Sequence, residues 1–176
     1  MERIFLIGYM GSGKTTVGKL LATKLGYSFV DMDAHIEEQQ FKSVSKIFAE
    51  RGEDEFRLLE QKCLHEVAQF DDVIISTGGG APCFFDNMDY MNAHGTTFYL
   101  RFTAAELANR LATQAAKRPL IATKKGDELR QFIVEGLEKR EPFYTQANYS
   151  VAGDVSAVVK EIVEIIGQHQ NKNFLL

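Results

Sequence analysis

The segment GYMGSGKT, residues 8–15, decides the fold of this chain. It has the pattern G-x-x-x-x-G-K-T, in which glycines let a loop turn its backbone N–H groups toward phosphate oxygens. The apolar run Ile4–Ile7 before it suits a buried parallel strand, and Lys14–Leu25 after it carries apolar residues at helical spacing. This context favours a nucleoside triphosphate site over a glycine-rich turn with a solvated lysine.

Each polar residue of this loop has an expected role toward a nucleotide. Lys14 would reach the β- and γ-phosphates, and the Thr15 hydroxyl would bind Mg²⁺. The positive end of the helix dipole would add to the attraction for phosphate. The loop residues expected to bind ATP are Gly11, Ser12, Gly13, Lys14, Thr15 and Thr16.

The rest of the chain alternates strand-like and helical segments. The expected strands are 4–7, 27–31, 73–76, 96–102 and 149–152. The helical segments between them include an apolar stripe over 56–68, a capping box at Thr103–Glu106 and a last helix that Asp154 would cap. This alternation predicts an α/β protein with a parallel sheet covered on both faces, with ligands bound at the carboxyl ends of the strands.

Bulk composition narrows the class further. A chain of 176 residues with 45% hydrophobic and 25% charged residues is typical of a single globular domain, which we expect over 1–176. The net charge of −4 predicts no nucleic-acid partner. Cys63 and Cys83 form no disulfide framework or zinc motif. No apolar run is long enough for a membrane span or signal peptide, so we expect a cytoplasmic protein.

Two carboxylates, Asp31 and Asp33, follow the second expected strand. Residues at i and i+2 of a strand share a face, so both would point into the same cleft. One could support Mg²⁺, and Asp31 is the candidate because the third strand ends in Ser76 and Thr77 rather than in an aspartate. Asp33 could accept a proton or hydrogen bond from a substrate hydroxyl, or could only cap the helix that follows.

A run of three glycines, Gly78–Gly80, follows the third expected strand. It brings bare backbone close to a ligand in the cleft or forms a simple turn. Two arginines, Arg57 and Arg140, could each bind a ligand or only pair with acidic residues of their own helix. Arg57 taken alone is better explained by pairing with Glu53 or Glu60 on its own helix. The segment 113–126 is basic and lacks an apolar stripe, and this composition predicts that the segment is a mobile loop.

Taken together, these motifs resemble the shikimate kinase family over nearly the whole chain. The resemblance rests on the phosphate loop, D-x-D at 31–33, F-x-x-x-G-E-x-x-F-R at 48–57, G-G-G-A at 78–81, R-P-L at 118–120 and K-R-x-P-x-Y at 139–144. It implies a P-loop three-layer α/β/α fold with five parallel strands, a substrate-binding region at 33–60 and a mobile lid at 113–126. It also implies ATP-dependent phosphorylation of the shikimate 3-hydroxyl, on the route to chorismate and the aromatic amino acids.

The resemblance also implies roles by position. Lys14, Asp33 and Arg118 would be catalytic; Arg110 and Arg118 would add to the ATP site; and Thr15 and Asp31 would hold Mg²⁺. Shikimate would contact Asp33, Arg57, Gly79, Gly80 and Arg140. The expected partners are ATP and shikimate, acting on a monomer without nucleic acid or membrane. The sequence departs from the family at Gln146 and at Pro82-Cys83, neither of which has an assigned role in transfer.

Other readings of the same motifs remain. A gluconate-type or nucleoside-monophosphate kinase would use the same fold, but a nucleotide acceptor needs a base-sized pocket and contacts to an acceptor phosphate. Two arginines beside Asp33 suit a small hydroxy acid instead. A nucleotide-binding module without catalysis would leave the joint presence of Lys14, Thr15, Asp33 and Arg118 unexplained.

Overall fold

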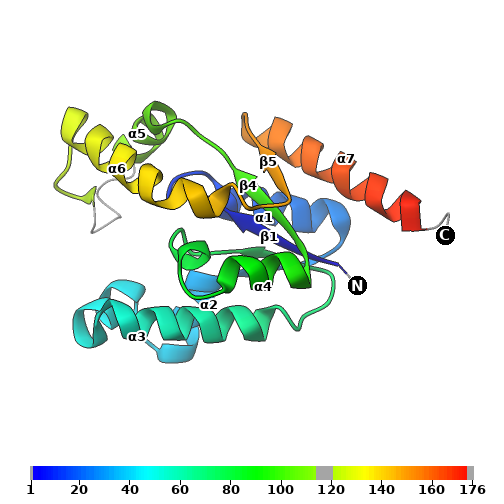
Figure 1. Ribbon diagram of the computed structural model, residues 1–176, viewed down its shortest axis with the longest axis horizontal. Helices are drawn as coiled ribbons and strands as arrows, with labels where there is room; N and C mark the ends of the chain where they lie inside the picture. The colour runs from blue at the N-terminus through cyan, green and yellow to red at the C-terminus, as the bar shows by residue number, and fades with distance from the viewer. Residues whose placement is uncertain (1, 114–120, 174–176) are drawn as a thin grey trace.

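The computed structural model describes residues 2–113 and 121–173 (Figure 1). Its centre is a parallel five-stranded sheet in the order β2-β3-β1-β4-β5. The strands are β1 (Arg3–Ile7), β2 (Ser28–Asp31), β3 (Val73–Ser76), β4 (Thr96–Leu100) and β5 (Tyr149–Val151). The predicted α/β fold class and strand number are therefore confirmed.

The sheet is buried on both faces because its central strand is apolar on both faces. In β1, Ile4 and Leu6 contribute to one hydrophobic cluster, and Phe5 and Ile7 contribute to the other. All four side chains are fully buried. Successive residues of a strand point to opposite faces, so this uninterrupted apolar run requires helices on both sides.

The helices divide unequally between the two faces, which makes three layers (Figure 1). One face is covered by α1 (Lys14–Leu25) and α7 (Val155–Asn173), which share a core with Ile4 and Leu6. The remaining helices contribute to the core on the other face: α2 (Met32–Gln40), α3 (Val44–Val67), α4 (Asn87–His94), α5 (Ala104–Ala112) and α6 (Gly126–Tyr144). A short 3₁₀ helix, η1 (Ala81–Cys83), follows the glycine run.

Several predicted boundaries are confirmed. Helix α1 and strand β3 have the expected limits, the capping box of Thr103 and Glu106 opens α5, and Asp154 accepts a hydrogen bond from the Ala157 N–H at 2.9 Å. Helix α7 continues to Asn173, and His169 on it contacts the Tyr149 hydroxyl at 2.6 Å.

Helix α3 bends sharply at Gly52, which has φ 81° and ψ 177°. These angles belong to a region that is essentially open only to glycine. The bend separates the first turns of α3 from the part that carries Arg57 and Glu60.

The carboxyl ends of β1, β2 and β3 lie at one edge of the sheet, where the phosphate loop, Asp31 and the glycine run follow them. Half of the expected lid, residues 114–120 with Arg118 among them, lies outside the described residues. The end of that segment is described, and there Ile121 is fully buried rather than solvated. None of the helices in 2–113 and 121–173 is both long and apolar enough to cross a membrane.

Candidate functional site

The phosphate loop joins β1 to α1 in an extended curve. Gly8, Gly11 and Gly13 all have positive φ, as the loop pattern predicts. Gly13 is the N-cap of α1 and supplies no side-chain hydrogen bond to the first helical turn. The beginning of α1 therefore lacks the side-chain acceptor that normally occupies a helix N-terminus, and the positive end of the helix dipole faces the loop.

The Lys14 side chain returns across the loop. Its Nζ donates hydrogen bonds to the carbonyl oxygens of Gly8 at 2.7 Å and Tyr9 at 3.1 Å. Lys14 is buried, with only 9% of its surface exposed to solvent. The ammonium group thus lies against the loop, where an incoming anion would meet both the charge and the start of α1.

Thr15 and Asp31 lie together at the mouth of the sheet. The Thr15 hydroxyl donates to the Asp31 Oδ2 at 2.7 Å. These are hard oxygen donors of the kind that Mg²⁺ prefers, and Mg²⁺ at such sites takes one or two carboxylates and completes its shell with phosphates and water. The pair fits that description, and no group of three or more acidic, His or Cys side chains suited to a metal occurs among the described residues.

The two aspartates differ from their expected geometry. Strand β2 ends at Asp31, which is itself the N-cap of α2 and accepts from the Ala34 N–H at 3.4 Å. Asp33 lies in the first turn of α2, so the two carboxylates are not strand neighbours on one face, and the capping role considered for Asp33 belongs to Asp31. Helix α2 begins at Met32, two residues earlier than it would if Asp33 were its N-cap.

Asp33 lines a cleft, and its side chain is exposed there to solvent. Loss of surrounding water raises the pKa of Asp33 above its ordinary value, and the nearby Asp31 carboxylate raises it further, whereas Lys14 lowers it. A carboxylate with a raised pKa, next to a phosphate loop, is suited to accept a proton from an alcohol.

The cleft has a volume of about 450 Å³. It collects most of the residues predicted to act on the nucleotide and acceptor: Gly11, Gly13, Lys14, Thr15, Thr16, Asp31, Asp33, Gly79 and Arg110. Ser12 is buried behind the loop and does not line it. The structure adds residues that the motifs did not indicate as ligand contacts: Met10, Ser76, Thr77, Thr113 and Val155. Ser76 and Thr77 follow from their place at the end of β3; nothing in the sequence indicates Met10.

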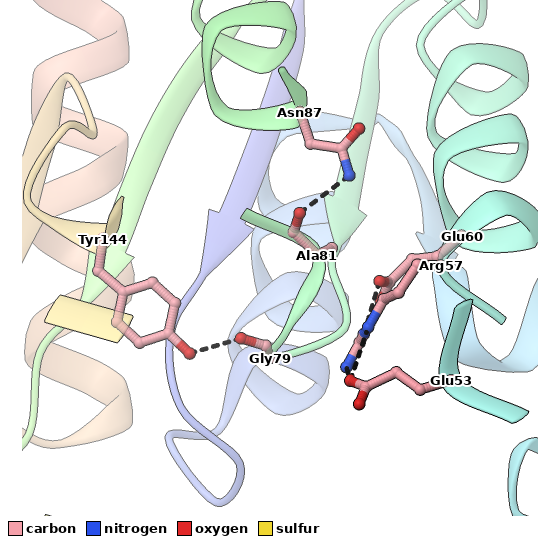
Figure 2. A network of polar contacts seen from close by, with 7 residues as sticks. All are labelled: Glu53, Arg57, Glu60, Gly79, Ala81, Asn87 and Tyr144. Carbon is pink, nitrogen blue, oxygen red and sulfur yellow. Dashed lines mark hydrogen bonds and ion pairs between the residues drawn. The ribbon is translucent and has the colours of Figure 1, made fainter. Parts of the chain in front are cut away.

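Arg57 makes the ion pairs on its own helix that its sequence context predicts. Its Nη2 donates to Glu53 at 2.9 Å and its Nη1 donates to Glu60 at 2.8 Å, as helical spacing predicts (Figure 2). Its guanidinium also lies over the Phe84 ring at 4.1 Å. A side chain on Gly80 would begin only 2.6 Å from Nη1 of Arg57, so glycine is what allows the guanidinium to lie against the glycine run.

Glu60 is the main residue of this region that the motifs did not assign to the site. It is 1% exposed, and burial raises its pKa to about 7, against the opposing charge of Arg57. The nearby Asp33 also raises this pKa. Its spacing of three residues from Arg57 indicated a pair on the helix surface. The structure instead packs this pair against the glycine run, Glu60 against Gly78 and Arg57 against Gly80.

Arg140 approaches the glycine run from α6. Its guanidinium carbon lies 5.0 Å from the centre of the Tyr9 ring, and a side chain on Gly79 would begin 3.4 Å from Arg140 Nη1. It has no carboxylate ion-pair partner within the described part of the chain. Arg57 and Arg140 therefore flank neighbouring glycines from two different helices, although their guanidinium groups do not line the main cleft.

Arg110 crosses the outer side of the phosphate loop. Its Nη1 lies 3.4 Å from the carbonyl oxygens of Gly11 and Ser12, and its guanidinium stacks over Phe102 at 4.2 Å. The planar cation is thereby held at the entrance of the cleft.

A phosphate loop that opens onto a carboxylate and a glycine segment bordered by arginines is the arrangement of a P-loop kinase, in which positioning and charge promote phosphoryl transfer. The family model described as shikimate kinase matches residues 10–170 of this chain. A shikimate kinase from Parabacteroides distasonis is 58% identical over 161 residues, which cover 92% of both chains. The chain therefore belongs to the shikimate kinase family.

Solved structures agree with this assignment. A shikimate kinase structure from Bacteroides thetaiotaomicron superposes with a TM-score of 0.89 at 49% identity, covering 94% of this chain and 98% of the other. A shikimate kinase structure from Acinetobacter baumannii, determined in complex with shikimate, has a TM-score of 0.86 at 29% identity. The match covers 96% of this chain and 94% of the other.

Proposed function

We propose that this chain transfers the γ-phosphoryl group of ATP to the 3-hydroxyl of shikimate, giving 3-phosphoshikimate and ADP, in the biosynthesis of chorismate and the aromatic amino acids. Membership of the shikimate kinase family supports the reaction. The observation that carries it is the shared cleft, in which Asp33 lies with the loop residues Lys14 and Thr15.

On the nucleotide side, the backbone of Gly11–Thr16 and the start of α1 would surround the phosphates. Lys14 would leave the carbonyls of Gly8 and Tyr9 to contact the β- and γ-phosphates, and Arg110 would lie beside the nucleotide. Arg118 is proposed to reach the transferring phosphate on sequence grounds alone, because it lies outside the described residues.

We propose that Mg²⁺ accompanies ATP and is held by Thr15 and Asp31, whose oxygens are already paired at 2.7 Å. When bound, it would neutralise phosphate charge. The protein's own contribution there is to keep two oxygen donors together at the end of β2 and the start of α1.

On the acceptor side, Arg57 and Arg140 would bind the shikimate carboxylate, since a planar guanidinium can donate two parallel hydrogen bonds to it. Gly79 and Gly80 would donate backbone hydrogen bonds. Asp33 would orient the 3-hydroxyl toward the γ-phosphorus and accept its proton as the new P–O bond forms. The loose transition state makes orientation a large part of this role.

We further propose a monomer in the cytoplasm that has ATP and shikimate as its partners, without nucleic acid or membrane. The net charge of −4 supports only the part about nucleic acid, because it gives the protein no overall positive charge to attract a polyanion.

The test is a coupled assay of ADP release with shikimate, gluconate and nucleoside monophosphates as separate acceptors. We expect turnover with shikimate and only background release with the others. Faster turnover with gluconate would replace the proposal by a gluconate-type kinase, and release that no acceptor stimulates would remove the kinase assignment.

A further inference from the structure

The glycine segment Gly78–Ala81 is held in place by buried side chains from two other helices. The Tyr144 hydroxyl of α6 donates to the Gly79 carbonyl oxygen at 2.5 Å, and the Asn87 amide of α4 donates to the Ala81 carbonyl oxygen at 2.9 Å (Figure 2). Both side chains are 0% exposed. The segment is thus held near both ends by side chains that come from other parts of the chain.

The Tyr144 bond has a particular position relative to Arg140. The two residues are four apart on α6, which places them on the same face of the helix. Gly79, which accepts the Tyr144 bond, also lies beside Arg140 and the phosphate loop. A side chain on Gly79 would begin 3.4 Å from Arg140 Nη1 and 3.4 Å from the Gly8 carbonyl oxygen. One hydrogen bond therefore joins the helix that carries Arg140 to the point where the glycine segment meets the phosphate loop.

The same bond sets the direction of a backbone donor. A trans peptide is planar, so a Gly79 carbonyl directed at Tyr144 turns the Gly80 N–H to the opposite side. Within the described residues, neither the Gly79 nor the Gly80 N–H has a hydrogen-bond partner. These donors are available to a ligand, and their direction depends on how the Gly79 carbonyl is held.

We propose that Tyr144 is a positioning residue for the acceptor: its hydroxyl sets the orientation of the Gly79–Gly80 peptide and its spacing from Arg140, with Asn87 holding the other end of the segment. This inference rests on the proposed function, in which those groups bind shikimate. It predicts that loss of either anchor weakens the acceptor site while the nucleotide site is spared.

A purely structural role for Tyr144 makes a different prediction. Its ring packs against Tyr99, with ring centres 5.1 Å apart, so the residue also fills the core. Burial raises the pKa of Tyr144, which keeps its hydroxyl a donor. The Tyr99 hydroxyl donates to Glu141 at 2.6 Å and does not contact the glycine segment. Tyr99→Phe is thus a matched control that removes a neighbouring buried hydroxyl without touching the segment.

The experiment compares the wild type, Tyr144→Phe and Tyr99→Phe by thermal unfolding, by calorimetry with shikimate, and by steady-state kinetics for both substrates. A carbonyl left without its donor should raise the shikimate Kd and KM of Tyr144→Phe about three- to tenfold. The KM for ATP should change by less than about twofold, and Tyr99→Phe should bind shikimate normally although it also loses a buried hydrogen bond. Wild-type shikimate affinity in Tyr144→Phe, or an equal loss in Tyr99→Phe, would overturn the proposal.

Asn87→Leu is a second variant that tests the other anchor. Leucine fills nearly the same volume and removes the donor to Ala81, and it also removes Oδ1, which has no partner among the described residues. Weaker shikimate binding with an unchanged KM for ATP supports the second anchor, and unchanged shikimate binding removes Asn87 from the proposal. A wild-type protein inactive on shikimate would instead refute the proposed function, which separates the two failures.

Discussion

Arg57 and Glu60 form an ion pair at 2.8 Å in which the carboxylate is almost completely buried and the guanidinium lies against Gly80. A buried pair of this kind is sensitive to the loss of one partner, because the other charge is left in a poorly solvated position. It also holds the guanidinium in one orientation at the wall of the candidate acceptor site. Binding and stability are therefore linked at this position.

Arg57→Ala should weaken shikimate binding much more than ATP binding. Loss of a charge-assisted hydrogen bond typically costs about 1.5–3 kcal/mol, or about one to two decades in affinity. Calorimetry with each substrate separately measures the effect. Arg51→Ala is the control, because Arg51 lies on the same helix and its polar contacts are long, with Gln40 at 3.4 Å and with Glu55 at 3.9 Å. Normal shikimate affinity in Arg57→Ala would remove this residue from the site.

The raised pKa of Glu60 predicts a pH dependence of stability. Burial raises this pKa from 4.5 to about 7, so between these values the folded state holds a proton that the unfolded state has released. The contribution of Glu60 to the free energy of unfolding should then decrease as pH rises from about 4.5 to about 7 and level off above. Denaturant unfolding of the wild type and Glu60→Gln across this range measures it. A pH-independent difference between the two proteins would contradict the prediction.

Asp33→Asn should reduce kcat more than it alters shikimate affinity. Asparagine keeps the size and an oxygen acceptor but cannot take the hydroxyl proton, and loss of a general base typically lowers the rate about 10²–10⁴-fold. A loose transition state favours the low end of that range. Kinetics at saturating shikimate provide the measurement. Since Asp31 rather than Asp33 caps α2, the variant should keep its thermal stability. Near-normal turnover would leave Asp33 without a role in the chemical step.

Lys14→Met should lower turnover by about 10²-fold or more, because removal of one charge-stabilising donor typically costs that much. The fold should survive, since the loop keeps its glycine turns and α1 keeps its core residues. Circular dichroism and ADP release on the same sample measure both effects. Lys19→Met on the exposed side of α1 is the control and should remain active. Full activity in a folded Lys14→Met protein would contradict the proposed phosphate site.

Gly52→Ala should destabilise the protein, because an alanine at φ 81° and ψ 177° carries a strain of about 1–3 kcal/mol. No side chain or backbone atom from elsewhere in the described fold lies within 4 Å of the position that the new methyl group would take, so the cost comes from the local backbone. Gly26→Ala is the matched control, with equal space around it and ordinary left-handed angles of φ 71° and ψ 26°. It should cost less, about 1 kcal/mol. Equal unfolding midpoints for the two variants would show that the bend in α3 is not strained.

Residues close in sequence were predicted well because local physical rules govern them. The strand–loop–helix around Lys14 follows from one apolar run, three glycines and one helical stripe, and the capping box at Thr103 follows from the spacing of two side chains. The parallel sheet follows from the alternation of such segments, since parallel strands need crossover connections.

These local rules could not predict which of Asp31 and Asp33 caps helix α2. The two lie two residues apart, and either can cap a helix or end a strand. Only the pairing of β2 with β3, which ends at Asp31 and Ser76, determines where the strand stops and α2 begins. The capping role then belongs to Asp31, and Asp33 is left to face the cleft.

Short motifs were enough to predict the class of fold, the phosphate loop and the candidate site residues, because each of these depends on residues close together in the chain. Only the folded chain shows which groups meet: Glu60 with Gly78, Arg57 with Gly80, and Tyr144 with the Gly79 carbonyl 65 residues away. Such contacts depend on how helices on one face of the sheet pack around a loop from its edge. Spacing along the chain carries no information about that packing, so the anchors of the glycine segment become visible only when the chain is folded.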